Sequence, residues 1–199
     1  MKRWDLVTVT RGPDGDVFEA RADHPDADLL KRLVASKSST VRSRATDELR
    51  AHLAAAGAPL RSDQPTTPAP AFEELVVAGL HLARRDPEVA RGLPVLLYLR
   101  LRAGMDLEAL ADHAVEHGVG HLLGFFLAIT GRLADEPALA RKARELRDHR
   151  VKDQELFLSP SQSRSSKKFA LGRAWGFRMR ADEEWFASLF DKFAKDANA

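Results

Sequence analysis

Three residues near the middle of the chain have the types and the spacing of a metal site. They are His113, Glu116 and His117. Histidines four residues apart lie on one face of an α-helix, where their imidazole nitrogens can bind one zinc ion. A glutamate beside such an ion can activate a water molecule for hydrolysis. His121, four residues further on, would join them if the helix continued that far.

The string His-x-x-Glu-His resembles the motif of inverted zinc peptidases. The resemblance implies a metal-dependent hydrolase in which His113 and His117 hold zinc and Glu116 activates water. That family needs a further glutamate ligand from a large mixed α/β domain, whereas this region predicts a small helical hairpin. A helical wheel places both histidines beside the apolar face and Glu116 on the opposite side. A hydrolase built on the His113/Glu116/His117 cluster is therefore the alternative hypothesis.

A simpler interpretation explains the same histidines. The helix dipole favours histidine in a last helical turn, and Gly118 is a natural residue to end the helix. The sequence contains no phosphate-binding glycine loop, nucleophile elbow or dinucleotide fingerprint. We therefore expect no enzyme, no cofactor and no bound metal.

The second candidate is a basic span from Arg164 to Arg180 that contains no acidic residue. Its binding residues would be Arg164, Lys167, Lys168, Arg173, Trp175, Phe177, Arg178 and Arg180. Basic side chains neutralise phosphates, and aromatic rings can stack on exposed bases. We predict that this span binds DNA, RNA or an acidic protein surface. The alternative is a solvated loop whose aromatic residues pack onto the body of the protein.

The third candidate is the aromatic face of the last predicted helix, formed by Trp185, Phe186, Leu189, Phe190 and Phe193. This face offers more apolar surface than a monomer normally exposes. Acidic residues fill the first turn of the helix, which disfavours an anionic membrane as the partner. We predict that the face docks on the chain's own core, on a second copy or on another protein.

The elements that must position these residues are mostly helical. Apolar periodicity predicts five helices between Phe72 and about Val151, and the stretch from Pro94 to Leu133 holds the densest supply of large apolar side chains. Short connections make neighbouring helices roughly antiparallel. The predicted fold is mainly α, an antiparallel helical bundle or a short stack of helical hairpins, with a small N-terminal β-hairpin.

Composition shifts predict four parts of the chain. They are a β-hairpin plus two helices (1–60), a Pro-rich linker (61–71), a five-helix core (72–157), and a basic loop with the aromatic helix (158–199). The hairpin strands are predicted at Trp4–Thr10 and Val17–Ala20. The two helices are predicted to start at His24 and at Ser38 or Ser39.

The string SSTVRSRATDEL, from Ser38 to Leu49, resembles the opening of a recognition helix in bacterial winged-helix regulators. The resemblance implies DNA binding. The chain departs from that pattern because a predicted hairpin replaces the usual first helix and the turn lacks glycine, so no family is assigned. The alternative is a solvated basic helix face.

Length and composition fit a globular protein of one or two small domains. The chain has 199 residues, 44% of them hydrophobic, and 31 basic against 29 acidic residues give a net charge of +2. It has no cysteine, and its N-terminus shows no secretion signal. Its longest apolar run falls far short of the roughly 20 residues that span a bilayer. We predict a cytoplasmic, non-catalytic regulatory or adaptor protein that binds a protein partner or itself, together with nucleic acid.

Overall fold

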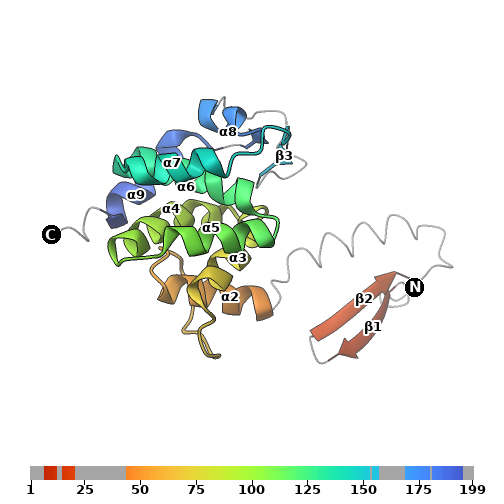
Figure 1. Cartoon of the computed structure of the whole chain (residues 1–199). Coiled ribbons are helices and arrows are strands. Elements are labelled where there is room, and N and C mark those ends of the chain that lie inside the picture. The colour runs from red at the N-terminus through yellow and green to blue at the C-terminus, as the bar shows by residue number, and fades with distance from the viewer. Residues whose placement is uncertain are drawn as a thin grey trace. The chain divides into compact units, whose positions relative to one another are not determined.

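The computed structural model describes residues 7–12, 15–20, 44–152, 154–156, 169–179 and 181–194 (Figure 1). Most of the described elements are helices, which confirms the prediction of a mainly α protein. The described helices are α2 (Arg44–Ala55), α3 (Phe72–Ala83), α4 (Pro87–Arg102), α5 (Leu107–Glu116), α6 (Gly120–Ala134), α7 (Pro137–Glu145), α8 (Ala170–Ala174) and α9 (Glu183–Ala194). The strands are β1 (Val7–Gly12), β2 (Gly15–Ala20), β3 (Gln154–Glu155) and β4 (Phe177–Arg178).

Contacts divide the chain into a unit from Met1 to Asp47 and a unit from Glu48 to Ala199. In the first unit, β1 and β2 pair antiparallel, with Val7 opposite Ala20. Both strands extend closer to the turn than predicted, and their last pair joins Gly12 and Gly15. The predicted helix that starts at His24 lies outside the described residues.

The division between the units differs from the boundary predicted at residues 61–71. The cause is α2, whose Leu53 is fully buried in the same core as α3 and α4. Arg50 of α2 is only 2% exposed, and its guanidinium pairs with the carboxylates of Asp86 and Glu88. The second half of α2 therefore belongs to the helical body and not to a separate N-terminal domain.

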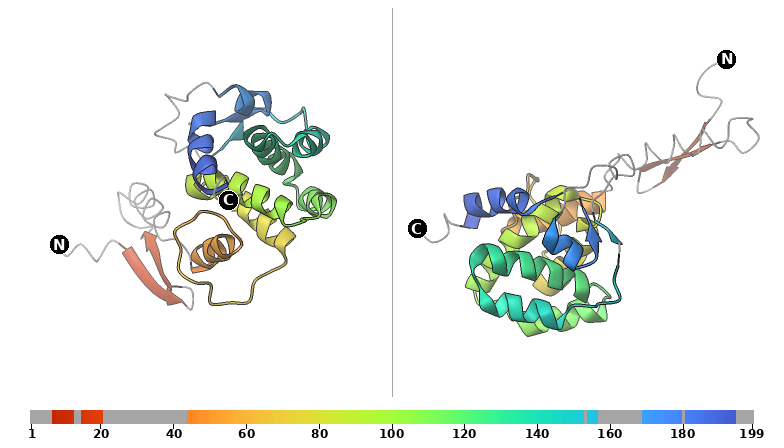
Figure 2. Two further views of the ribbon diagram at one scale, coloured as in Figure 1. Left: turned by 90° about the vertical axis from the view of Figure 1, so that its left-hand side faces the viewer. Right: turned by 90° about the horizontal axis from the view of Figure 1, so that it is seen from above.

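The Pro-rich segment between α2 and α3 curves around α2 (Figure 2). The carboxylate of Glu48 accepts hydrogen bonds from the backbone N–H and the hydroxyl of both Thr66 and Thr67, at 2.6 to 2.9 Å. These bonds, that of the Thr67 N–H above all, lower the pKa of Glu48 to about 2. Nε2 of His52 also lies within hydrogen-bond distance, 2.9 Å, of the Thr67 hydroxyl oxygen. The Pro-rich segment is therefore bound to α2, although the sequence predicted a free linker between this helix and the helical core.

Helix α6 lies at the centre of the second unit and packs against α4, α5, α7 and α9 (Figure 1). All side chains from Leu122 to Leu127 are buried, which agrees with the apolar stretch in the sequence. Five helices, α3 to α7, lie between Phe72 and Val151, as predicted. Helix α4 continues through Pro94, so the apolar stretch that begins there starts inside a helix and not at a helix end.

The starts of α4 and α5 follow directly from the sequence. Asp86 accepts hydrogen bonds from the N–H groups of the second and third residues of α4, and Asp106 does the same for α5. Each cap satisfies backbone donors that have no partner within the helix. Within the described ranges, no helix combines the length and the apolarity needed to cross a bilayer.

Candidate functional site

The described part of the predicted basic span, residues 169–179, packs its aromatic rings into the core. Trp175 is 4% exposed and Phe177 is 3% exposed. Trp175 lies so close to α6 that a Cβ added at Gly124 would come within 2.9 Å of its ring. Phe125 contacts both rings, with centroids 6.4 Å from Trp175 and 5.0 Å from Phe177. These two aromatic residues, predicted to stack on nucleic-acid bases, have no ring face open to a base.

A glycine brings two distant segments together beside this aromatic layer. Gly176 has φ of 72°, and a Cβ there would lie 2.3 Å from the carbonyl oxygen of Val151, so no other residue fits without backbone movement. The close approach lets β3 and β4 pair in parallel. The Gln154 N–H donates to the Gly176 carbonyl at 2.9 Å, and the Leu156 N–H donates to the Arg178 carbonyl at 3.0 Å.

The joined segments enclose a surface depression of about 330 Å³. Three cations line it: Arg147 and Lys152 from the segment after α7, and Arg173 from α8. We call these three residues the cationic triad. His149 lines the same depression. The guanidinium of Arg147 donates to the Ala174 carbonyl and lies 5.6 Å from the Trp175 ring centroid, which fixes its position.

Among the described residues, Asp148 is the acidic one on the wall of the depression, and its charge is neutralised by a neighbouring arginine. Its two carboxylate oxygens accept hydrogen bonds from the Arg150 guanidinium at 3.0 and 3.1 Å. This pairing is the main cause that lowers the pKa of Asp148 to about 2. Among the described residues, neither Lys152 nor Arg173 forms an ion pair. The depression therefore presents net positive charge.

His121 holds the two sides of the depression together. Its Nδ1 accepts a hydrogen bond from the Asp148 N–H at 2.9 Å. Its Nε2 must then carry the proton and donates to the Trp175 carbonyl, also at 2.9 Å. Burial is the largest cause that lowers the pKa of His121, which favours the neutral ring that these two hydrogen bonds require. Because both nitrogens are bound, His121 is not available to the metal cluster that the sequence proposed.

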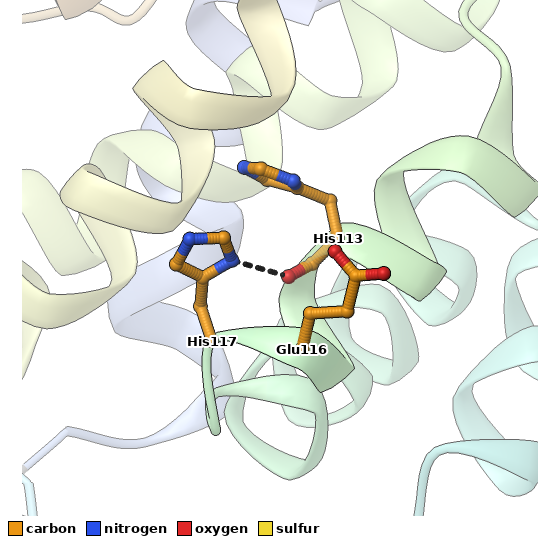
Figure 3. A group of neighbouring side chains, drawn as sticks. All are labelled: His113, Glu116 and His117. Carbon is orange, nitrogen blue, oxygen red and sulfur yellow. Dashed lines mark hydrogen bonds between the residues drawn. The ribbon is translucent and has the colours of Figure 1, made fainter.

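The remaining metal candidates do come together at the end of α5 (Figure 3). One ring nitrogen each from His113 and His117 and one carboxylate oxygen of Glu116 lie within 4.8 Å of one another. The helical wheel had placed Glu116 on the opposite side, but its long side chain reaches back to the histidines. The centroids of the two histidine rings are 4.3 Å apart. Nδ1 of His117 lies 2.9 Å from the His113 carbonyl oxygen. Gly118, with φ of 69°, ends the helix before His121.

The other predicted binding residues are distributed as follows. Arg164, Lys167, Lys168 and Arg180 lie outside the described residues, and Arg178 is exposed on β4. Sequence reasoning missed Arg147, His149 and Lys152. A signal for them exists, because residues 141–152 contain six basic residues and only two acidic ones.

The aromatic face of α9 docks on the chain's own core, the first of the three partners considered. Phe186 and Phe190 are buried, and the Phe190 ring lies 5.2 Å from Tyr98 of α4. Arg91 of α4 donates to the Trp185 carbonyl at 2.7 Å and lies over the Trp185 ring. Leu189 is half-buried, and Phe193 remains 40% exposed.

No family model, curated protein or solved structure matches this chain.

Proposed function

We propose that this protein is a non-catalytic binding protein of regulatory or adaptor type, and that its cationic triad binds the phosphates of single-stranded nucleic acid. One observation carries the proposal. Two segments about 20 residues apart in the sequence place Arg147, Lys152 and Arg173 around one depression, and Asp148, the acidic group on its wall among the described residues, is already paired. In this proposal the helices form an antiparallel bundle that serves as a rigid scaffold, and the protein acts in the cytoplasm.

The chemistry of the depression favours phosphate over other ligands. Lys152 and Arg173 are exposed, so binding a polyanion releases counterions and leaves no buried charge unpaired. The position of Arg147 is fixed in advance by Ala174 and Trp175, which reduces the conformational entropy lost on binding. Because Trp175 and Phe177 are buried, neither ring offers a base a face to stack on. We therefore expect contacts to the backbone and little preference for base sequence.

A protein partner or a second copy is the other component of the proposal. Most of the aromatic face predicted for this role is covered by α4 and α6. Phe193, near the end of α9, is the most exposed side chain of that face. We propose it as the contact for such a partner.

The test is a salt titration of binding to a fluorescently labelled single-stranded oligonucleotide, followed by anisotropy. We expect the double variant Lys152→Ser/Arg173→Ser to bind more weakly. Its log-log salt slope should be smaller than that of the parent by about 1.4, since each lost phosphate contact on a single strand accounts for about 0.7. The matched control is Arg84→Ser/Arg85→Ser, which removes two exposed charges at the end of α3 and should leave the slope unchanged.

Two results would overturn the proposal. One is the absence of binding by the parent at low salt. The other is an equal loss of affinity in both double variants, because this would show that the net charge of the protein, and not the depression, attracts the oligonucleotide.

A further inference from the structure

We propose that His113, Glu116 and His117 form a binding site for a divalent transition-metal ion. The inference is independent of the nucleic-acid proposal, since it concerns different residues on α5. Its starting point is that three donor atoms of suitable type lie within 4.8 Å of one another, all from one helical turn (Figure 3).

The geometry needs only a small adjustment to hold an ion. In a tetrahedral zinc site with bonds of about 2.0 to 2.2 Å, ligand atoms lie roughly 3.3 Å apart. Glu116 and His117 are exposed and His113 is half-buried. Rotation of the His113 and Glu116 side chains about their own bonds can therefore close the remaining gap without moving the helix or the His117 ring.

The hydrogen bond of His117 supports the same inference. A carbonyl oxygen can only accept, so the contact to the His113 carbonyl places the proton of His117 on Nδ1. The Nε2 lone pair of His117 is then available to a metal. Metal-binding histidines commonly donate their other ring N–H to a backbone carbonyl in this way, which orients the ring and makes it a better ligand.

Electrostatics at this end of α5 also favours a cation. The helix contains no lysine or arginine, and its acidic residues Glu108, Asp112 and Glu116 recur every four residues along one stripe. His113, Glu116 and His117 belong to the last turn, where the carbonyl ends of the helix concentrate partial negative charge. An ion bound there would meet attraction from the side chains and from the helix dipole.

The donor set selects the class of ion. Two imidazoles and one carboxylate suit zinc, copper, nickel or cobalt, whereas magnesium and calcium prefer all-oxygen ligands. Three protein ligands leave a fourth position for water. The inference covers binding of the ion and assigns it no reaction.

The experiment is calorimetric titration of the full-length, chelator-treated protein with zinc chloride near neutral pH. We expect about one zinc per chain. His113→Gln and His117→Gln should each lower the affinity more than about tenfold, because loss of even an outer partner of a metal ligand costs about 10- to 100-fold. Glu116→Gln should lower it several-fold. The control His149→Gln removes an exposed histidine at the cationic depression and should not change zinc binding, and magnesium chloride should give no binding heat.

Circular dichroism of each variant checks that the helices are retained. The proposal is wrong if the parent takes up no zinc in the micromolar range. It is also wrong if His113→Gln/His117→Gln binds zinc as the parent does, because another histidine would then be the ligand. An unchanged affinity in Glu116→Gln alone would remove the carboxylate from the site.

Discussion

The cationic depression and the histidine turn of α5 are built in opposite ways. The histidine turn uses five consecutive residues of one helix, 113–117, with side chains mostly at the surface. The depression uses two segments about 20 residues apart, which meet because Gly176 lies against Val151 over a buried aromatic layer. A local motif is thus visible in the sequence, whereas a site made by tertiary packing is not.

The two regions also carry opposite charge. Residues 141–152 contain six basic and two acidic residues, while α5 contains three acidic residues and no lysine or arginine. The net charge of +2 hides this separation. It follows that the depression should attract anions and the turn cations, and that mutations should affect the two regions very differently.

The largest difference should appear on truncating an apolar side chain in each region. Trp175→Ala removes a ring that is 4% exposed, and loss of a buried tryptophan costs about 3 to 5 kcal/mol. Val115→Ala in the histidine turn removes two methyl groups from a side chain that is 58% exposed, and should cost less than about 0.5 kcal/mol. Urea denaturation measures both. Similar losses would show that the aromatic layer does not support the depression.

The second difference concerns two glycines with nearly equal backbone angles. Gly176 and Gly118 have φ of 72° and 69°, but only Gly176 is crowded, since nothing lies within 4 Å of a Cβ added at Gly118. Gly118→Ala should cost about 1 to 2 kcal/mol for the left-handed conformation alone. Gly176→Ala adds an overpacking cost and should lose about 2 to 5 kcal/mol. Equal values in urea denaturation would argue against the close approach of Gly176 to Val151.

The third difference is in the response to acid. The pKa of His121 is lowered, mainly by burial, with Arg147 and His149 acting in the same direction, while the hydrogen bond to the Trp175 carbonyl and the charge of Asp148 oppose them. Below about pH 6.5 the unfolded chain binds a proton at this residue that the folded chain does not. The free energy of unfolding should therefore fall as the pH drops below about 6.5. The stabilisation that comes from the neutral His121 ring is fully present above that pH.

His121→Gln keeps a donor and an acceptor but cannot titrate. Below about pH 6.5, the stability of this variant should depend less steeply on pH than that of the parent. Thermal unfolding at several pH values measures the slope. If parent and variant show the same slope, His121 does not link proton binding to the folding of this region.

Much of the fold could be predicted because its signals are local. The capping residues Asp86 and Asp106 mark two helix starts, and Gly118 marks the end of α5. The attachment of residues 61–71 to α2 could not be predicted in the same way. The composition of this segment is typical of a free linker, but Glu48 on α2 binds Thr66 and Thr67, and no local pattern encodes a contact across that distance.

The candidate site shows the same limit. Arg173 is predictable because it lies in a continuous basic span, and the sequence assigns Trp175 and Phe177 to a ligand because basic residues surround them. In the fold these rings face Phe125, which lies some 50 residues earlier. Arg147 and Lys152 were missed because their role depends on the pairing of β3 with β4, two strands too short to leave a periodic signal.

The smallest expected effect lies where the two regions meet. Lys142 of α7 donates to Glu108 of α5 at 2.6 Å and also pairs with Glu145, and these hydrogen bonds, that to Glu108 above all, raise the pKa of Lys142. Glu108 is 71% exposed, and Glu145 keeps Lys142 paired when Glu108 is lost. Glu108→Gln should therefore change the free energy of unfolding by less than about 0.5 kcal/mol, and high salt should abolish the change.

The same substitution tests whether the charge separation matters for binding. It removes one negative charge from the acidic stripe and leaves Lys142 less neutralised, so nucleic-acid binding should strengthen slightly and zinc binding should weaken slightly. Glu108 lies eight residues from Glu116, about 12 Å along the helix, which is close to the screening length of about 10 Å at 0.1 M salt. Each affinity should therefore change by less than about twofold, in opposite directions. Anisotropy and calorimetric titrations at low salt measure the two changes, and a shift of both affinities in the same direction would mean that the substitution acts through stability and not through charge.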